Sequence, residues 1–377
     1  MSNPTQQNIL GACLAPSVYE KGGGYGQKGV DFQRYWAISR IIELATADEP
    51  DFLILFESLQ DIVEFDHAQA PTNAKIYQLK MKDTGEWTWK ALTALPIQSR
   101  KKRNSDELKT PKAFVESPVG KIVCSLVELD PLTAEGHFVS NVGSNAGLEN
   151  GSTAGTLRVC RFSELSQELR DQIVPELQKL RKTVSLDDIH IDKTDLSLED
   201  PDTHVTGKIH NYLQIAAPRH AGQARSFSDS LFAVLSKRGR RTDPPKDFGE
   251  LVRTRGFSKS EFKEALDALK SRPDEQALIT TWLAYLQDDG MPLTQLTKLQ
   301  IRLARLVEER LKTGKPDSSP YESAAKDWIA SNPPDDNILE FVLNGARALA
   351  AHFPTASQDH LQAEIVLEGI HQCLSQI

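Results

Sequence analysis

The sequence predicts an α/β domain in the N-terminal part of the chain, followed by an α-helical C-terminal region. Two observations lead to this prediction. Early in the chain, apolar residues at helical spacing are followed by three short segments with strand-like patterns. From about residue 221 onward, the segments are amphipathic with helical spacing. At 377 residues, the chain is long enough for two or three domains, each with its own core.

The first elements are an arm, a helix and three strands. Residues 1–30 are expected to form a loose arm that ends in a glycine cluster. A helix follows over residues 31–45, with Asp31 as its expected N-cap. Residues 52–58 are a continuous apolar run, as in a strand buried on both faces. Alternation of polar and apolar residues predicts two further strands, over residues 61–66 and 74–82.

The chain then continues with alternating helices and strands. We expect an apolar helix that opens at residues 117–121 (SPVGK). Short strands are expected in GHFVSNVG, LRVCRFSEL and LDDIHIDKTDLSL, and helices in SQELRDQIVPELQKLRKTV and GKIHNYLQIAAP. Everything after residue 221 is expected to be helical.

Composition and net charge limit the classes of protein to which this chain can belong. The chain has the 39% hydrophobic and 25% charged residues of an ordinary globular protein. A net charge of −8 argues against a protein that coats DNA over its whole surface, but it leaves room for a local basic groove. Because the sequence shows neither a signal peptide nor a run of about 18 apolar residues, we expect a cytoplasmic protein without a membrane span. The widely spaced cysteines are expected to be buried thiols; they are Cys13, Cys124, Cys160 and Cys373.

Polar residues on consecutive predicted strands form a candidate active site. Asp61 opens the second strand, and the third strand carries Gln78 and Lys80, whose side chains share one face because strands repeat every two residues. Metal-dependent nucleases of the restriction-endonuclease type build their sites from an acid on one strand and a Q-x-K sequence on the next. Glu57, at the end of the first strand, and Gln33, on the first helix, would complete the pocket.

Phosphodiester hydrolysis explains these residue types. A divalent cation activates water and neutralises the charge that develops on phosphorus, and Mg²⁺ prefers hard oxygen ligands. Asp61 and Gln78 offer such oxygens, whereas Lys80 would hold the water or the scissile phosphate. A salt-bridged sheet without catalytic function is the alternative, because lysine is also common on edge strands.

A glycine motif, the histidines and two basic clusters allow further interpretations of the sequence. Residues 24–29 (GYGQKG) match G-x-G-x-x-G before a helix, as in dinucleotide sites, although the preceding residues make a poor strand. The histidines, His67 and His137 among them, lack metal-binding spacing and are expected on the polar surface or as satisfied core residues. Two basic clusters, at residues 100–103 and 237–241, are either solvated loops or the sides of a DNA-binding cleft.

Several segments together resemble a known family. They are GVDFQ (29–33), Glu57 with Asp61, QLK (78–80), Trp87 with Trp89, SPVGK (117–121), FVSN (138–141), GK (207–208) and GFSKSEF (256–262). In this order they resemble the double-stranded DNA endonuclease domain of bacterial anti-phage effectors, first named for its place in cyclic-oligonucleotide (CBASS) defence systems. That domain belongs to the PD-(D/E)xK superfamily. The resemblance extends over about residues 20–270.

The resemblance implies a Mg²⁺- or Mn²⁺-dependent endonuclease that cleaves double-stranded DNA. Its catalytic positions map to Asp61, Gln78, Lys80 and Gln33, and its metal ligands to Asp61, Glu57 and Gln78. The implied organisation is an arm over residues 1–20, a restriction-endonuclease-like nuclease domain over 21–215, and an α-helical oligomerisation or partner-binding region over 216–377.

The C-terminal region departs from the CBASS version, whose cyclic-oligonucleotide sensor domain is larger and of mixed α/β character. Residues 275–377 are short and helical, with apolar faces wide enough to bury against another subunit. Nuclease domains of this kind also occur beside a HerA-type ring ATPase, and such a partner suits a chain without an ATP motif. We therefore expect a homo-oligomer with a HerA-type partner. The alternatives are a CBASS effector nuclease and a catalytically weak DNA-binding scaffold.

Overall fold

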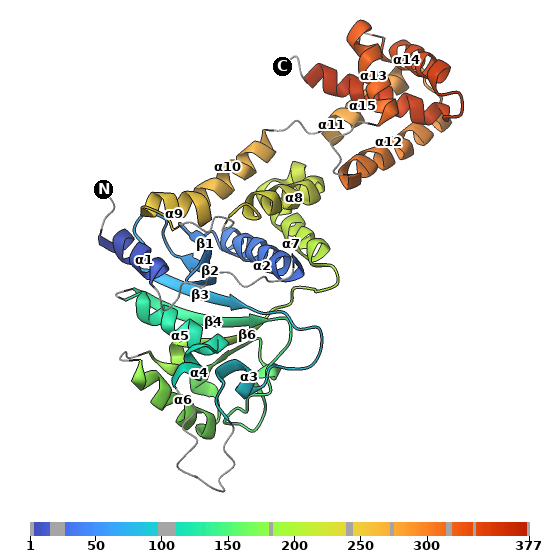
Figure 1. Cartoon of the computed structure of the whole chain (residues 1–377). Coiled ribbons are helices and arrows are strands. Elements are labelled where there is room, and N and C mark those ends of the chain that lie inside the picture. Colours follow the sequence, from blue (N-terminus) through green and yellow to red (C-terminus); the bar gives the residue numbers. More distant parts are fainter. Residues whose placement is uncertain are drawn as a thin grey trace. The chain divides into compact units, whose positions relative to one another are not determined.

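The computed structural model describes residues 4–15, 27–96, 111–130, 132–180, 184–238, 244–271, 275–313, 319–334 and 337–374. The chain divides into two compact units, Met1–Asp267 and Ala268–Ile377. Unit 1 contains a seven-stranded sheet with helices on both faces, and unit 2 is helical in its described residues (Figure 1). The predicted α/β fold with a helical C-terminal region is therefore confirmed.

The sheet of unit 1 has the strand order β5-β6-β4-β3-β2-β1-β7. Its strands are β1 (Leu53–Ser58), β2 (Gln60–Phe65), β3 (Asn73–Leu79), β4 (Thr133–Ser140), β5 (Val159–Arg161), β6 (Ile189–Lys193) and β7 (Gly256–Ser258). The first three strands form an antiparallel meander, and β3, β4 and β6 run parallel. At the two edges, β5 pairs antiparallel with β6 and β7 pairs antiparallel with β1. The predicted strands of the meander thus form the half of the sheet next to β7.

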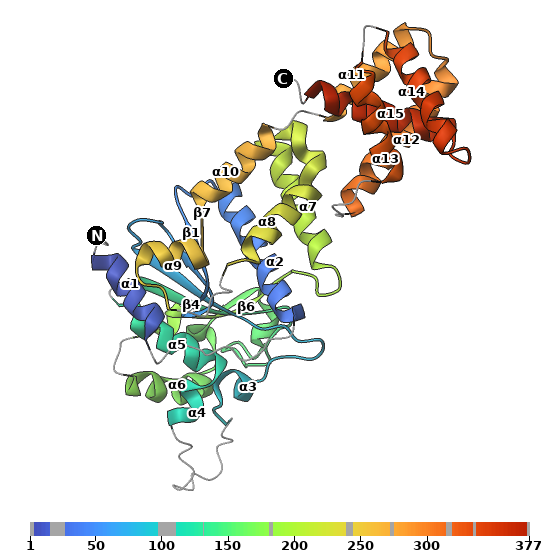
Figure 2. The ribbon, with the colours of Figure 1, turned by 45° about the horizontal axis from the view of Figure 1, so that its top comes forward.

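Helices cover both faces of this sheet. The helices of this part of the chain are α1 (Pro4–Leu14), α2 (Gln27–Thr46), α3 (Trp89–Thr93), α4 (Pro111–Val115), α5 (Pro118–Glu128), α6 (Gln167–Lys179), α7 (Pro201–Ala216), α8 (Ala224–Leu235), α9 (Phe248–Arg255) and α10 (Lys259–Lys270). Apolar side chains of α1, α5, α6 and α9 join those of the strands in one core. Helix α2 packs with α7 and α8, and α9 lies beside α1 at the β1 end of the sheet (Figures 1 and 2). Helix α5 begins as predicted, because Ser117 caps it by accepting a hydrogen bond from the Gly120 amide.

The α2 face of the sheet contains a buried polar pairing. Arg40 on α2 donates from Nε and Nη2 to the two carboxylate oxygens of Glu64, at 2.7 and 2.9 Å. The hydroxyl of Tyr77 donates to the same carboxylate at 3.1 Å. Since a buried charge is tolerated only when it is paired and hydrogen-bonded, this contact fixes α2 against β2 and β3.

Three sequence predictions about the ends of unit 1 are wrong. Residues 4–14 form helix α1 and not a loose arm, because Ile9, Ala12 and Cys13 bury against the main core. Helix α2 begins at Gln27, so Asp31 lies inside it and is not its N-cap. The region expected to be wholly helical contains the strand β7, which extends the sheet beyond β1.

The described residues of unit 2 contain five complete helices and the end of α10. The complete helices are α11 (Glu275–Asp288), α12 (Leu293–Thr313), α13 (Pro320–Ser331), α14 (Ile338–His352) and α15 (Gln358–Leu374). Helix α15 is buried along most of its length and packs against the other four. Cys373, near its end, is exposed, whereas the other three cysteines are buried, so the expectation of a buried thiol is wrong for Cys373. None of the described helices combines the length and the apolar character that a bilayer span requires.

Candidate active site

The β1–β2 hairpin brings two acidic residues together. In its register Phe56 pairs with Ile62 and Ser58 pairs with Gln60, which sets Glu57 across from Asp61. Directly opposed residues on antiparallel strands have closely spaced side chains. The acid at the end of the first predicted strand and the acid at the start of the second are therefore neighbours.

The backbone of this hairpin adopts an unfavourable conformation. Glu57 and Leu59 have φ angles of 49° and 63°, in the left-handed region that costs a residue with a side chain about 1–2 kcal/mol. Neighbouring groups hold the turn in place. The side chain of Gln60 donates to Ser125 Oγ on α5 at 2.9 Å, and the side chain of Leu59 is buried in the main core. Helix α5 thus fixes the turn that carries both acids.

Asp61 is joined directly to the third strand. The Gln78 amide donates from Nε2 to Oδ2 of Asp61 at 2.5 Å, and the backbone N–H of Leu79 donates to the same oxygen at 2.7 Å. Both side chains are buried, Asp61 being 7% exposed and Gln78 3%. Because Ile62 pairs with Tyr77, the register of β2 and β3 places Asp61 opposite Gln78. The acid and the amide predicted on neighbouring strands are therefore in contact.

Lys80 lies just beyond the end of β3 and is half-buried. Its backbone N–H donates to the Val139 carbonyl of β4 at 3.0 Å, which continues the pairing of β3 with β4. The positive charge of Lys80 acts on the Glu57 carboxyl group. The structure thus groups Glu57, Asp61, Gln78 and Lys80.

Gln33 is related to this group less directly. It is buried on α2, and its Oε1 atom has no hydrogen-bond partner among the described residues. The residue that follows it, Arg34, faces Glu57. Gln33 therefore lies next to the site on the chain, with a buried carbonyl oxygen still able to accept a hydrogen bond.

Two arginines near Glu57 were missed by sequence reasoning. Nη2 of Arg34 lies 3.7 Å from Oε1 of Glu57, and the Arg34 guanidinium stacks 4.5 Å from the centroid of the Phe56 ring. Arg255, at the end of α9, donates from Nη1 to the Glu57 carbonyl at 2.6 Å. Arg34 directly follows Gln33 in the sequence, but Arg255 lies far along the chain and no spacing links it to the site.

The electrostatic environment of Glu57 is unusual for a glutamate. Burial and the nearby Asp61 carboxylate raise the pKa of Glu57 to about 7. The positive charges of Arg34, Arg255 and Lys80 act in the opposite direction and only partly offset this rise. The Glu57 side chain keeps 41% of its surface exposed, so solvent moderates the effect. Near neutral pH, Glu57 is therefore divided between its charged and neutral forms.

The donor set fits a hard divalent cation. Asp61 and Glu57 provide carboxylate oxygens and Gln78 an amide oxygen, which are ligands of Mg²⁺ and Mn²⁺. Repulsion between the two carboxylates contributes to the raised pKa of Glu57, and a cation between them would remove that repulsion. The residues can thus hold a divalent cation, provided that the amide of Gln78 turns its oxygen toward the ion.

The predicted basic clusters are described only in part. Residues 100–103 and 240–241 lie outside the described residues, as do residues 24–26 of the glycine motif. Arg238 donates to the carbonyl of Arg253 and to Glu261, and its own carbonyl accepts from Arg34 Nη2 at 3.1 Å. Lys237, Arg238 and Arg253 line a cavity of about 320 Å³. A basic surface therefore lies beside the arginine that faces Glu57.

A helix is followed by an antiparallel meander and a parallel crossover, with an acid and a Q-x-K sequence on neighbouring strands, which is the arrangement expected of an α/β nuclease domain. The family model of the Cap4 dsDNA endonuclease domain matches residues 21–239, more than half of the chain, and the protein belongs to this family. The resemblance predicted from the sequence is thereby confirmed. Neither the curated proteins nor the solved structures include a match to the chain.

Proposed function

We propose that the protein is a Mg²⁺- or Mn²⁺-dependent endonuclease that cleaves double-stranded DNA as an effector of phage defence. The observation that carries this proposal is the contact between Asp61 and Gln78 on neighbouring strands, in a chain that belongs to a DNA endonuclease family. Asp61, Glu57 and Gln78 are the proposed cation ligands. Lys80 and Gln33 are the proposed supporting residues of the reaction.

The proposed roles follow from the positions and charges of these residues. A divalent cation at this site supplies an activated water and neutralises charge on the phosphate. Asp61 is held rigidly, because one of its oxygens accepts two hydrogen bonds from β3. The ammonium group of Lys80 would bind the scissile phosphate and stabilise the charge that develops on its oxygens. Gln33 would use its buried carbonyl oxygen to orient a water molecule or the Lys80 side chain.

The two arginines next to Glu57 would act through that residue. Arg34 faces the Glu57 carboxylate and Arg255 binds the Glu57 carbonyl, so together they would fix the second acid across from Asp61. Because both are positively charged, they favour the charged form of Glu57 that a cation needs. We regard them as positioning residues.

A plasmid-cleavage assay tests this function. Supercoiled plasmid is incubated with the full-length protein in Mg²⁺ or Mn²⁺, and conversion to nicked and linear forms is followed. We expect cutting by the wild type and a loss of at least about 100-fold in Asp61→Asn and Lys80→Ala, the magnitude typical for removal of a group that stabilises transition-state charge. Lys82→Ala and Asp83→Asn are matched controls. Lys82 donates to the Glu86 carbonyl at 2.6 Å, and Asp83 is exposed.

Two results would contradict the proposal. Equal cutting by Asp61→Asn, Lys80→Ala and the wild type would refute the site. DNA binding without any cation-dependent cutting, with and without a partner ATPase, would identify the scaffold alternative, whose binding weakens with salt as phosphate contacts do.

We further propose that the protein assembles with itself and with a HerA-type ring ATPase through residues 216–377, and that residues 21–215 form the nuclease domain. The sequence has no ATP-binding motif, and the helical unit leaves Tyr285, Leu293 and Ile301 exposed at 53%, 72% and 50%. Size-exclusion chromatography with light scattering tests both associations. A monomeric mass would refute self-association, and failure to co-elute with such an ATPase would refute the partnership. If the same protein still cuts plasmid, the nuclease proposal stands.

A further inference from the structure

Two buried histidines lie side by side in the parallel half of the sheet. His137 on β4 pairs in register with His190 on β6, and their rings stack with centroids 4.4 Å apart and an interplanar angle of 12°. Both residues are more than nine-tenths buried, at 7% and 5% exposure. Glu135 precedes His137 by two positions, so it lies on the same face of β4.

Three of the four ring nitrogens of this pair lack a hydrogen-bond partner among the described residues. Nε2 of His137 and both ring nitrogens of His190 have no hydrogen-bond partner among the described residues, although all three atoms are buried. Glu135 Oε2 lies 3.6 Å from Nε2 of His137, beyond hydrogen-bond distance. Buried polar atoms are normally hydrogen-bonded, so three unpaired nitrogens in one place require an explanation. The expectation that His137 is a satisfied core residue is wrong in this respect.

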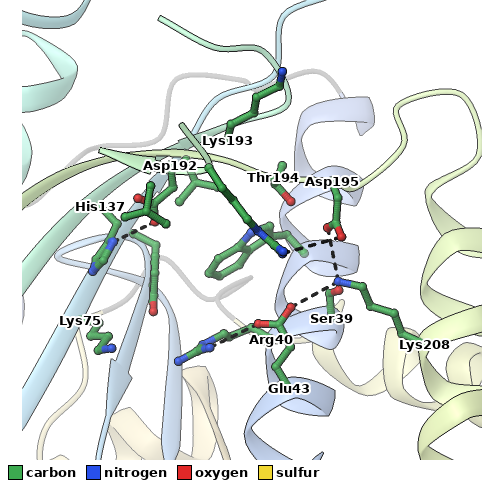
Figure 3. Close-up of a pocket in the computed structure, with 15 residues that line it drawn as sticks. Ser39, Arg40, Glu43, Lys75, His137, Asp192, Lys193, Thr194, Asp195 and Lys208 are labelled. Carbon is green, nitrogen blue, oxygen red and sulfur yellow. Dashed lines mark hydrogen bonds and ion pairs between the residues drawn. The ribbon is translucent and has the colours of Figure 1, made fainter. Parts of the chain in front are cut away.

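The three side chains converge as metal ligands do. One ligand atom each from Glu135, His137 and His190 lie within 4.8 Å of one another. On its other side, Nδ1 of His137 is 2.8 Å from Oδ2 of Asp192, a contact visible at one end of the pocket in Figure 3. A carboxylate that accepts the proton of one ring nitrogen leaves the lone pair of the other nitrogen available, which is the usual support of a metal-bound histidine.

We propose that Glu135, His137 and His190 form a binding site for a borderline transition-metal ion of the Zn²⁺ class. Two imidazoles and one carboxylate are a donor set typical of Zn²⁺, in contrast to the all-oxygen set around Asp61. The ion would join β4 to β6, and water from the adjoining cavity of about 210 Å³, which His137 and Asp192 line, would complete its coordination. Asp192 is the positioning residue for His137.

The charges around the site agree with a bound cation. Glu135 and Asp192 place two carboxylates beside the histidine pair. Two positive groups compete with such an ion. Nζ of Lys75 lies 3.8 Å from Oε2 of Glu135, and Arg161 on β5 pairs in register with His190 and acts on it with its charge. The Glu135 side chain is 43% exposed and can therefore leave Lys75 and turn toward the histidines.

Metal analysis of the full-length protein tests this site without reference to nuclease activity. The protein is stripped with a chelator, exposed to Zn²⁺ or Co²⁺, and freed of excess metal. We expect one ion per chain, visible d–d absorption from bound Co²⁺, and a higher melting temperature with Zn²⁺. Excess Mg²⁺ should not displace the ion. The variants His190→Gln and Glu135→Gln should bind Zn²⁺ at least tenfold more weakly. Because Glu135 is half-exposed, Glu135→Gln should leave the fold intact, so its weaker binding would not be caused by misfolding.

Two control variants show whether the metal binds at this site or at another one. His67→Gln removes a half-exposed histidine that interacts with Asp51, and Asp61→Asn alters the proposed nuclease site. Both should bind Zn²⁺ and Co²⁺ as the wild type does. The proposal is overturned if the wild type retains no metal, if His190→Gln and Glu135→Gln retain as much as the wild type, or if Asp61→Asn alone abolishes binding.

Discussion

The side-chain amide of Gln78 donates a 2.5 Å hydrogen bond to Oδ2 of Asp61, so an amide N–H occupies one of the two carboxylate oxygens that could bind a cation. For both residues to bind the same ion, the amide must turn over and present Oε1 in place of Nε2. The contact thus holds Asp61 in place before metal binds. We therefore expect substitutions of residue 78 to change how strongly the proposed cation is held.

Substitutions of Gln78 should therefore show separately how this side chain contributes to positioning Asp61 and to binding the cation. In Gln78→Glu, two carboxylates face each other, so we expect a lower melting temperature than the wild type without divalent cation and a larger rise on addition of Mg²⁺. In Gln78→Leu, the lost hydrogen bond should destabilise the fold by about 1–3 kcal/mol, and Mg²⁺ should raise the melting temperature less than in the wild type. Thermal unfolding with and without Mg²⁺ measures both effects. Identical Mg²⁺ shifts in all three proteins would argue against a cation at this position.

The raised pKa of Glu57 predicts a definite dependence on pH. Because its folded-state pKa of about 7 exceeds the ordinary value of 4.5, the folded protein binds more protons than the unfolded chain between these values. The stability contributed by protonated Glu57 is full below pH 4.5 and is lost as pH rises through 7. Glu57→Gln should therefore raise the melting temperature at pH 8 more than at pH 5, in the absence of divalent cation. Glu86→Gln, at an exposed position, is the control and should show no such difference.

Cation binding should show the opposite trend with pH for the same reason. Only charged Glu57 is a good ligand, so Mg²⁺ affinity in the wild type should fall as pH drops below 7. Titration calorimetry at pH 6 and pH 8 checks this expectation. Affinity that is equal at the two pH values would show that Glu57 does not bind the ion.

The basic surface beside Arg34 should contribute to DNA affinity. Lys237 and Arg253 are exposed and line the same cavity, and phosphate contacts by such residues release counterions. The variants Lys237→Ala and Arg253→Ala should each weaken DNA binding without changing sequence preference and lower the slope of log K against log salt by about 1. Fluorescence anisotropy at several salt concentrations measures this slope, and Lys263→Ala serves as a control on α10. Unchanged slopes would place the DNA elsewhere.

A glycine on β4 should be required for packing of α5. A side chain at Gly136 would lie 2.1 Å from Cγ2 of Ile122, so Gly136→Ala should destabilise unit 1 by about 1–3 kcal/mol. Gly207, inside α7, has open space around it, and Gly207→Ala should instead stabilise the protein by about 0.5–1 kcal/mol. Urea unfolding of both variants gives the two free energies. Equal effects of the two substitutions would contradict this packing of α5 on β4.

The elements that could be predicted from the sequence are those with a pattern of their own. The apolar run of β1 and the alternation in β2 and β3 identify three strands, and their order gives the contact between Asp61 and Gln78. The parallel strands β4 and β6 also follow from short apolar segments. Local pattern therefore predicted the part of the site that is built from consecutive strands.

The elements that were missed depend on contacts between distant segments. Strand β7 has three residues, too few to show alternation, and it forms because β1 offers an open edge. Helix α1 has a polar beginning and gains its stability from burying Ile9 and Cys13 against the main core. The pairing of His137 with His190 arises from strand neighbours that are far apart in sequence, so no spacing could reveal it.

The hydrogen bond from Arg255 to the Glu57 carbonyl has a consequence for the order in which the protein is made. Residues 57 and 255 are 198 positions apart, so this contact of the hairpin forms only after residue 255 has been synthesised. Strand β7, which closes the same edge, comes directly after Arg255. A nascent or prematurely terminated chain that lacks this segment has both acids and the contacts of the turn with α5, but it lacks the hydrogen bond from Arg255 to Glu57. We therefore expect a chain that is truncated before Arg255 to hold Glu57 less firmly than the 377-residue chain does.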